Sequence, residues 1–201
     1  MKLTLLARVL LLVTGLLAAY QIAVGIDGMA TPAIVAYTIA FGVLLVAGLL
    51  LLILGLDVLE SPVVVVLSTV IPLSLSLGLV WEHLPGIRSL YLGFVLVGFL
   101  AVLVTRLRSA PNKLPVIVLA LVHGIAGLTI FLLPVLISFT GRASPGFALV
   151  GLGGALMGVG GLLLALPKAG RPLLPRPAIL KLLPGLLLLM TLAFVAGFAL
   201  A

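Results

Sequence analysis

Residues 114–138 read LPVIVLALVHGIAGLTIFLLPVLIS, an unbroken run without Asp, Glu, Lys or Arg. A helix over these residues rises about 37 Å, which is enough to cross the roughly 30 Å hydrocarbon core of a bilayer. A single helix can enter lipid in this way because it hydrogen-bonds its backbone groups internally. The run therefore predicts a transmembrane helix.

Six further apolar runs have similar length and composition. The seven runs lie near residues 3–25, 32–56, 62–80, 87–106, 114–138, 146–166 and 178–200. The first is longer than the apolar region of a signal peptide, so we interpret it as a retained span. The sequence predicts an all-α, polytopic transmembrane helical bundle of about seven spans, with residues 1–201 forming a single transmembrane domain.

Bulk composition agrees with lipid as the main solvent. Hydrophobic residues make up 64% of the 201 residues, charged residues only 7%, and the mean hydropathy is +1.54. A water-soluble domain is about half apolar and about one-quarter charged. The absence of Cys excludes disulfides and thiolate metal sites. Scarce Asn, Gln and Cys are also a mark of thermophile proteins, although a very hydrophobic membrane protein drifts the same way.

Positive charge is distributed unequally between the two sides of a seven-span bundle. Of the eleven Lys and Arg residues, only Arg88 and Arg142 fall on one side. The other nine share the side of the N-terminus: Lys2, Arg8, Arg106, Arg108, Lys113, Lys168, Arg171, Arg176 and Lys181. The positive-inside rule predicts a cytoplasmic N-terminus and an external C-terminus, in a multi-pass protein of a prokaryotic cell membrane. The net charge of +7 indicates contact with anionic lipid, and no basic face suggests nucleic acid as a partner.

A parallel internal repeat would relate the second and third spans to the sixth and seventh. An ungapped shift of 113 residues aligns Pro32–Pro145, Val46–Val159, Gly48–Gly161, Leu49–Leu162, Leu50–Leu163, Leu51–Leu164 and Pro62–Pro175. A Leu-rich chain produces roughly half as many identities by chance. Transporters use parallel repeats, and duplication without a transport role explains the pattern equally well.

The sixth span carries four glycines at helical spacing. Gly151, Gly154, Gly158 and Gly161 share one face, and Gly154–Gly158 matches GxxxG. Helix association in lipid depends on close backbone approach, which small residues permit. We expect this face to pack against a neighbouring helix of the same chain, and a subunit interface is the alternative.

His123 is the candidate ligand residue in the membrane interior. It lies about 13 Å along the fifth span, beside Gly124 and Gly127, whereas His83 falls in the external segment after the third span. Haem ligation by both histidines is therefore a poor match. A neutral His123 bonded to a neighbouring carbonyl or hydroxyl is the simpler interpretation, and no cofactor is predicted. A single haem or a quinone on His123 stays open, since intramembrane ionisable residues are often functional.

The third span offers hydroxyl groups around Pro72. Ser68, Thr69 and Ser74 could line a weakly polar pathway for a neutral or amphipathic solute. The structural alternative is a proline-kinked helix whose hydroxyls satisfy its own backbone. In the external segment that follows, Glu82 and Arg88 are placed to pair across the turn.

Several functional classes find no support in the sequence. The acidic residues Asp27, Asp57, Glu60 and Glu82 fall in loops or at helix ends, whereas proton-coupled carriers usually hold carboxylates within their spans. No metal site and no catalytic motif is present, so no catalytic residue is assigned and we do not expect an enzyme. We predict a non-catalytic accessory or structural subunit of a larger membrane complex, with other membrane subunits or further copies of itself as partners. The alternatives are a small-solute or lipid transporter and, more weakly, a haem- or quinone-contacting protein.

Overall fold

The computed structural model describes residues 3–108, 113–167, 170 and 173–201, and every regular element within them is helical. Lys2, Lys168 and Arg171, counted above in the charge distribution, lie outside the described residues. The elements are α1 (Leu5–Val24), α2 (Thr31–Leu54), η1 (Leu56–Glu60), α3 (Pro62–His83), η2 (Pro85–Ile87), α4 (Arg88–Leu107), α5 (Leu114–Phe139), η3 (Pro145–Phe147), α6 (Ala148–Ala165) and α7 (Arg176–Ala199). Seven helices are long and apolar enough to cross a membrane, which confirms the predicted all-helical class and the number of such segments.

The third helix differs most from its predicted range. It continues to His83, so Glu82 and His83 belong to its last turn and not to a loop. The helix ends where Leu84 takes non-helical backbone angles, φ −130° and ψ 67°, because the following Pro85 disfavours the helical conformation in the residue before it. This extra turn decides where the polar side chains of the segment lie.

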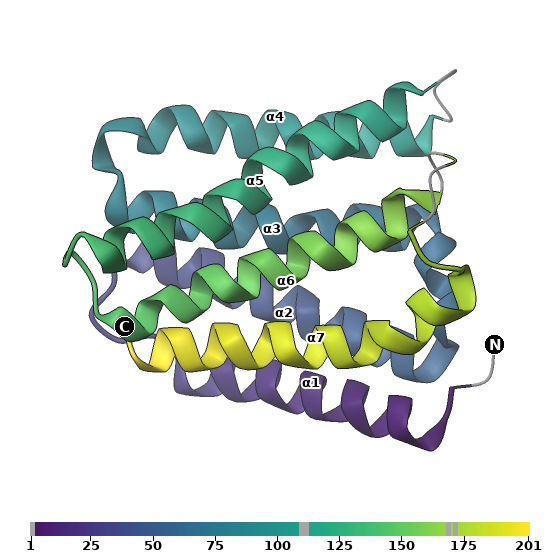
Figure 1. Cartoon of the computed structure of the whole chain (residues 1–201). Coiled ribbons are helices and arrows are strands. Elements are labelled where there is room, and N and C mark those ends of the chain that lie inside the picture. Colours follow the sequence, from purple (N-terminus) through teal and green to yellow (C-terminus); the bar gives the residue numbers. More distant parts are fainter. Residues whose placement is uncertain (1–2, 109–112, 168–169, 171–172) are drawn as a thin grey trace.

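The helices form a closed ring with one helix outside it. Along the ring α1, α2, α3, α5, α6 and α7 each contact the next, and α7 contacts α1. In Figure 1, α5, α6 and α7 form the front layer, with α2 and α3 behind them. Helix α4 packs outside this ring, against α3 and α5.

Aromatic side chains fill the interior of the ring. Tyr37 and Phe41 of α2 meet Phe198 of α7, with ring centroids 4.6 and 6.1 Å apart. Phe147 lies 6.0 Å from Phe198, and Phe194 is fully buried in the same core cluster. Large rings that interdigitate at these distances pack the two layers together.

A second core cluster holds α4 on the ring. Val66 and Leu73 of α3, Val102 of α4, and Val122 and Ala126 of α5 are buried together. Gly98 of α4 allows the close approach, because a Cβ there would lie 3.2 Å from Cγ2 of Val122. The helices α3, α4 and α5 thus form a three-helix unit around this cluster.

Candidate functional sites

Three of the four hydroxyl side chains of α3 bond to their own helix. Ser68 Oγ and Thr69 Oγ1 both donate to the carbonyl of Val65, at 2.9 and 2.8 Å, and Ser76 Oγ donates to Leu73 at 3.1 Å. Ser74 is buried. These hydroxyls therefore donate to backbone carbonyls of their own helix near Pro72, as expected for a proline-containing helix in lipid.

A polar contact that the sequence does not predict connects α4 with α5. The Tyr91 hydroxyl donates to Thr129 Oγ1 at 3.1 Å, and Thr129 Oγ1 in turn donates to the carbonyl of Ile125 at 2.9 Å. Tyr91 also interacts with the Ser76 side chain of α3. The feature of the sequence that could have predicted this contact is a tyrosine inside an apolar span, because a buried phenol needs a hydrogen-bond partner. The contact fixes the register of the three helices.

His123 is half-buried in α5. Its imidazole interacts with the backbone of Leu119, one turn earlier on the same helix, although its Nδ1 makes no hydrogen bond of normal geometry among the described residues. It lies close enough to Arg106 of α4 for the two side chains to interact electrostatically. The structure does not bring His83 to it: measured from the starts of α3 and α5, the two histidines differ by roughly 18 Å along the bundle. Nothing in the structure tests the alternative in which a single haem or a quinone binds to His123.

The opposite end of the ring holds a cluster of Tyr37, Glu82 and His83. Glu82 Oε2 accepts a 2.9 Å hydrogen bond from the backbone N–H of Ala30, which ties the α1–α2 connection to α3. Glu82 also interacts electrostatically with Tyr37 and with His83. Within the described part of the chain, the buried Tyr37 hydroxyl and His83 Nε2 have no hydrogen-bond partner. A carboxylate beside a phenol and an imidazole can hold a small hydrogen-bonding group.

A glycine positions Tyr37 in this cluster. A Cβ on Gly78 would lie only 2.5 Å from Cε1 and 2.7 Å from Cζ of the Tyr37 ring, so the phenol packs directly on the α3 backbone. Glu82 follows Gly78 by one helical turn and shares its face. The sequence draws attention to Glu82 and His83 but not to Tyr37, whose hydroxyl is placed by a helix distant in sequence.

The predicted pairing of Glu82 with Arg88 is wrong. Arg88 Nε donates to the backbone carbonyl of Trp81, and its guanidinium lies 5.8 Å from the centroid of the Trp81 ring. Because Glu82 lies in the last turn of α3 and accepts from Ala30, the two charged side chains have different partners. Trp81 and Arg88 thus form a separate cation–π contact at this end of the bundle.

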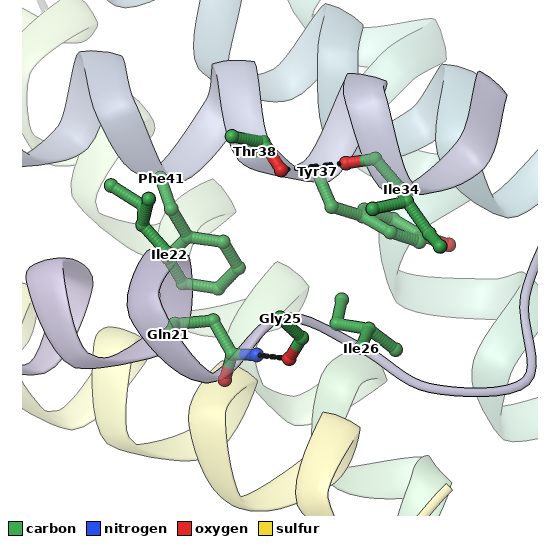
Figure 2. A pocket seen from close by; sticks show the side chains of 8 residues that line it. All are labelled: Gln21, Ile22, Gly25, Ile26, Ile34, Tyr37, Thr38 and Phe41. Atoms are coloured by element: carbon green, nitrogen blue, oxygen red, sulfur yellow. Dashed lines mark hydrogen bonds between the residues drawn. The ribbon is translucent and has the colours of Figure 1, made fainter. Parts of the chain in front are cut away.

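Figure 2 shows the small pocket between the end of α1 and the start of α2. Gln21 Nε2 donates to the carbonyl of Gly25 at 2.8 Å, and Thr38 Oγ1 donates to the carbonyl of Ile34 at 2.9 Å. The pocket measures about 10 Å³, which is room for about one water molecule. Of the three polar side chains that line it, Gln21 and Thr38 bond to backbone, whereas the Tyr37 hydroxyl has no hydrogen-bond partner among the described residues.

The four glycines of α6 divide into two pairs. Gly151 and Gly154 are buried, and Cβ atoms there would lie 2.7 Å from the backbone O and 2.8 Å from the backbone N of Phe131 in α5. Gly158 and Gly161 are exposed, and a Cβ added to either would have nothing within 4 Å. The first pair is therefore occupied by an intramolecular contact, and the second pair is open on the outer surface.

The outer surface also carries an apolar groove between α2 and α3. It has a volume of about 160 Å³ and runs from Gly42 to Leu50 of α2, opposite Val64 and Leu67 of α3. Its lining is almost entirely hydrocarbon, which suits an apolar occupant.

Comparison with known proteins identifies no relative: no family model, no curated protein and no solved structure matches the chain.

Proposed function

We propose that the protein is a non-catalytic accessory subunit that supports a larger membrane complex through its outer surface. The observation that carries the proposal is the solid interior of the ring, which is filled by Tyr37, Phe41, Phe147, Phe194 and Phe198, each at most 5% exposed. Of the α3 hydroxyls that would line a polar pathway, those of Ser68 and Thr69 are bonded to the backbone carbonyl of Val65. A packed interior leaves the lipid-facing surface as the part available for interaction.

Two features of that surface suit a partner helix. Gly158 and Gly161 expose the α6 backbone on the outside, and close backbone approach is what favours helix association in lipid. The apolar groove between α2 and α3 offers a second recess. Both features favour protein or lipid neighbours over a polar solute.

The proposal is tested by recovering the tagged protein from its own membrane in a mild detergent and identifying co-purified proteins by quantitative mass spectrometry. We expect reproducible partner subunits with the wild-type protein. The double variant Gly158→Leu/Gly161→Leu should lower their recovery by about fivefold, equivalent to about 1 kcal/mol of binding free energy.

The matched control is Gly93→Leu, because Gly93 of α4 is also exposed with nothing within 4 Å of a new Cβ. This variant should leave partner recovery unchanged. A wild-type protein that purifies alone or only as a homo-oligomer would contradict the accessory role, and any small molecule retained would then favour transport.

A transporter of a small solute or lipid is the second candidate, supported by the neighbours of each helix. Under the 113-residue shift, α1, α2 and α3 correspond to α5, α6 and α7. The contacts α1–α2, α2–α3 and α3–α5 then correspond to α5–α6, α6–α7 and α7–α1, all of which occur. Gly28 and Gly141, which the shift also aligns, both adopt positive φ, at 76° and 70°. Two parallel halves joined by α4 are an arrangement that transporters use.

For topology, we propose a cytoplasmic N-terminus and an external C-terminus in a prokaryotic cell membrane, on the charge asymmetry described above. The chain has no cysteine, so a single introduced thiol reports its own location. Arg142→Cys should react with a membrane-impermeant maleimide in intact cells or spheroplasts, whereas Arg108→Cys should react only after permeabilisation. Both positions are exposed loop arginines, so the reverse labelling pattern would refute this orientation.

A further inference from the structure

Two buried side-chain nitrogen atoms, one on α4 and one on α5, make no hydrogen bond of normal geometry within the described part of the chain. They are Nε of Arg106 and Nδ1 of His123, both buried although each residue is half-exposed. We propose that Arg106 and His123 form a binding site for an anionic phospholipid, with the guanidinium on the phosphodiester and the imidazole on the glycerol-ester region. This site is separate from the outer surfaces invoked for partner subunits.

The register of α4 and α5 brings these side chains toward each other. Gly98 packs beside Val122, and Tyr91 bonds to Thr129, so the helices run antiparallel. The same register places the Cα of Arg106 about 13 Å along the axis from that of His123. Side chains lean toward the N-terminus of their own helix. In an antiparallel pair, Arg106 and His123 therefore lean toward each other, consistent with their electrostatic interaction.

The depth of the pair suits a lipid headgroup. Helix α5 has 26 residues and is about 39 Å long, whereas the hydrocarbon core is about 30 Å thick. With α5 centred in the bilayer, the Cα of His123 lies about 9 Å below the hydrocarbon boundary, and its side chain leans back toward that boundary. Arg106 lies in the last turn of α4, at the level of the phosphates. One lipid can span both depths.

The charges at this end of the bundle favour an anion. Arg108 and Lys113 flank the pair and are exposed. Asp57, in the nearby α2–α3 connection, interacts with Arg176. A guanidinium pairs with phosphate in a bidentate geometry, and basic pockets between transmembrane helices bind anionic headgroups. A half-buried guanidinium whose Nε has no acceptor among the described residues therefore favours a phosphodiester partner.

The test is native mass spectrometry of the full chain released from nanodiscs that contain equal amounts of phosphatidylcholine and phosphatidylglycerol. We expect phosphatidylglycerol to remain bound in preference to phosphatidylcholine. Arg106→Gln should reduce this retention by at least about fivefold, equivalent to about 1 kcal/mol. Arg108→Gln removes the same charge at the same end of α4 and should reduce the retention far less, because Arg108 is exposed and its charge is screened by water.

Three outcomes would overturn the proposal. One is equal loss in the Arg106→Gln and Arg108→Gln variants, which would indicate non-specific attraction to a basic surface. Another is equal retention of the two lipids by the wild-type protein, a result that does not depend on how any variant folds. The third is displacement of phosphatidylglycerol by inorganic phosphate at millimolar concentration, which would assign the site to a free anion.

Discussion

Gly154→Ala should lower the free energy of unfolding by about 3 kcal/mol, the upper range for an inserted methyl group in a packed interior. The new Cβ would lie 2.8 Å from the backbone N of Phe131 and 2.9 Å from the backbone C of Ile130. Backbone atoms cannot turn aside as a side chain does, so α5 and α6 must separate along their length. We would measure unfolding in bicelles by titration with a denaturing detergent.

Gly158→Ala is the matched control, one helical turn away on the same helix. Nothing lies within 4 Å of its new Cβ, so the variant should be neutral or more stable by about 0.5–1 kcal/mol, because Ala is the better helix former. Equal destabilisation by the two variants would mean that the α5–α6 contact is not where the structure places it.

Phe194→Ala should have the second largest effect. Phe194 is 0% exposed and fills the space above Gly153, where a Cβ would lie 2.6 Å from its ring. We expect a loss of about 2–3 kcal/mol, below the roughly 3–5 kcal/mol of a water-soluble core, because lipid also solvates apolar side chains of the separated helices. The same unfolding titration measures it, with Leu189→Ala as a control on the exposed face of α7 (Leu189, 56% exposed).

A double variant makes the Phe194 prediction specific. Gly153→Ala alone should destabilise the protein, because its methyl group meets the Phe194 ring. Combined with Phe194→Ala, the methyl group instead occupies part of the new cavity, so the double variant should be at least about 1 kcal/mol more stable than the sum of the single effects. Simple additivity would show that the two residues do not contact each other.

Parts of the candidate sites can be recognised in the sequence, and others cannot. His123 stands out because an ionisable residue in an apolar run is unusual. Its neighbour Arg106 counts in the sequence only as a topological charge, because nothing there reports the register of α4 against α5. Tyr37 escapes notice for the same reason: its surroundings are built by Gly78 of α3 and Phe198 of α7, which are distant in the chain.

The seven long helices were determined by the sequence alone, because a segment that must satisfy its backbone in lipid has the helix as its local solution. The end of α3 was less predictable, since Trp81, Glu82 and His83 are polar or interfacial residues that a hydropathy pattern assigns to a loop. Only the tertiary structure decided which helices are neighbours and which face of each turns inward. In α4, Val102 is 0% exposed and Leu90 is 77% exposed, yet both are aliphatic. Lipid and protein interior present the same apolar environment to such residues, so their order in the sequence does not separate the two faces.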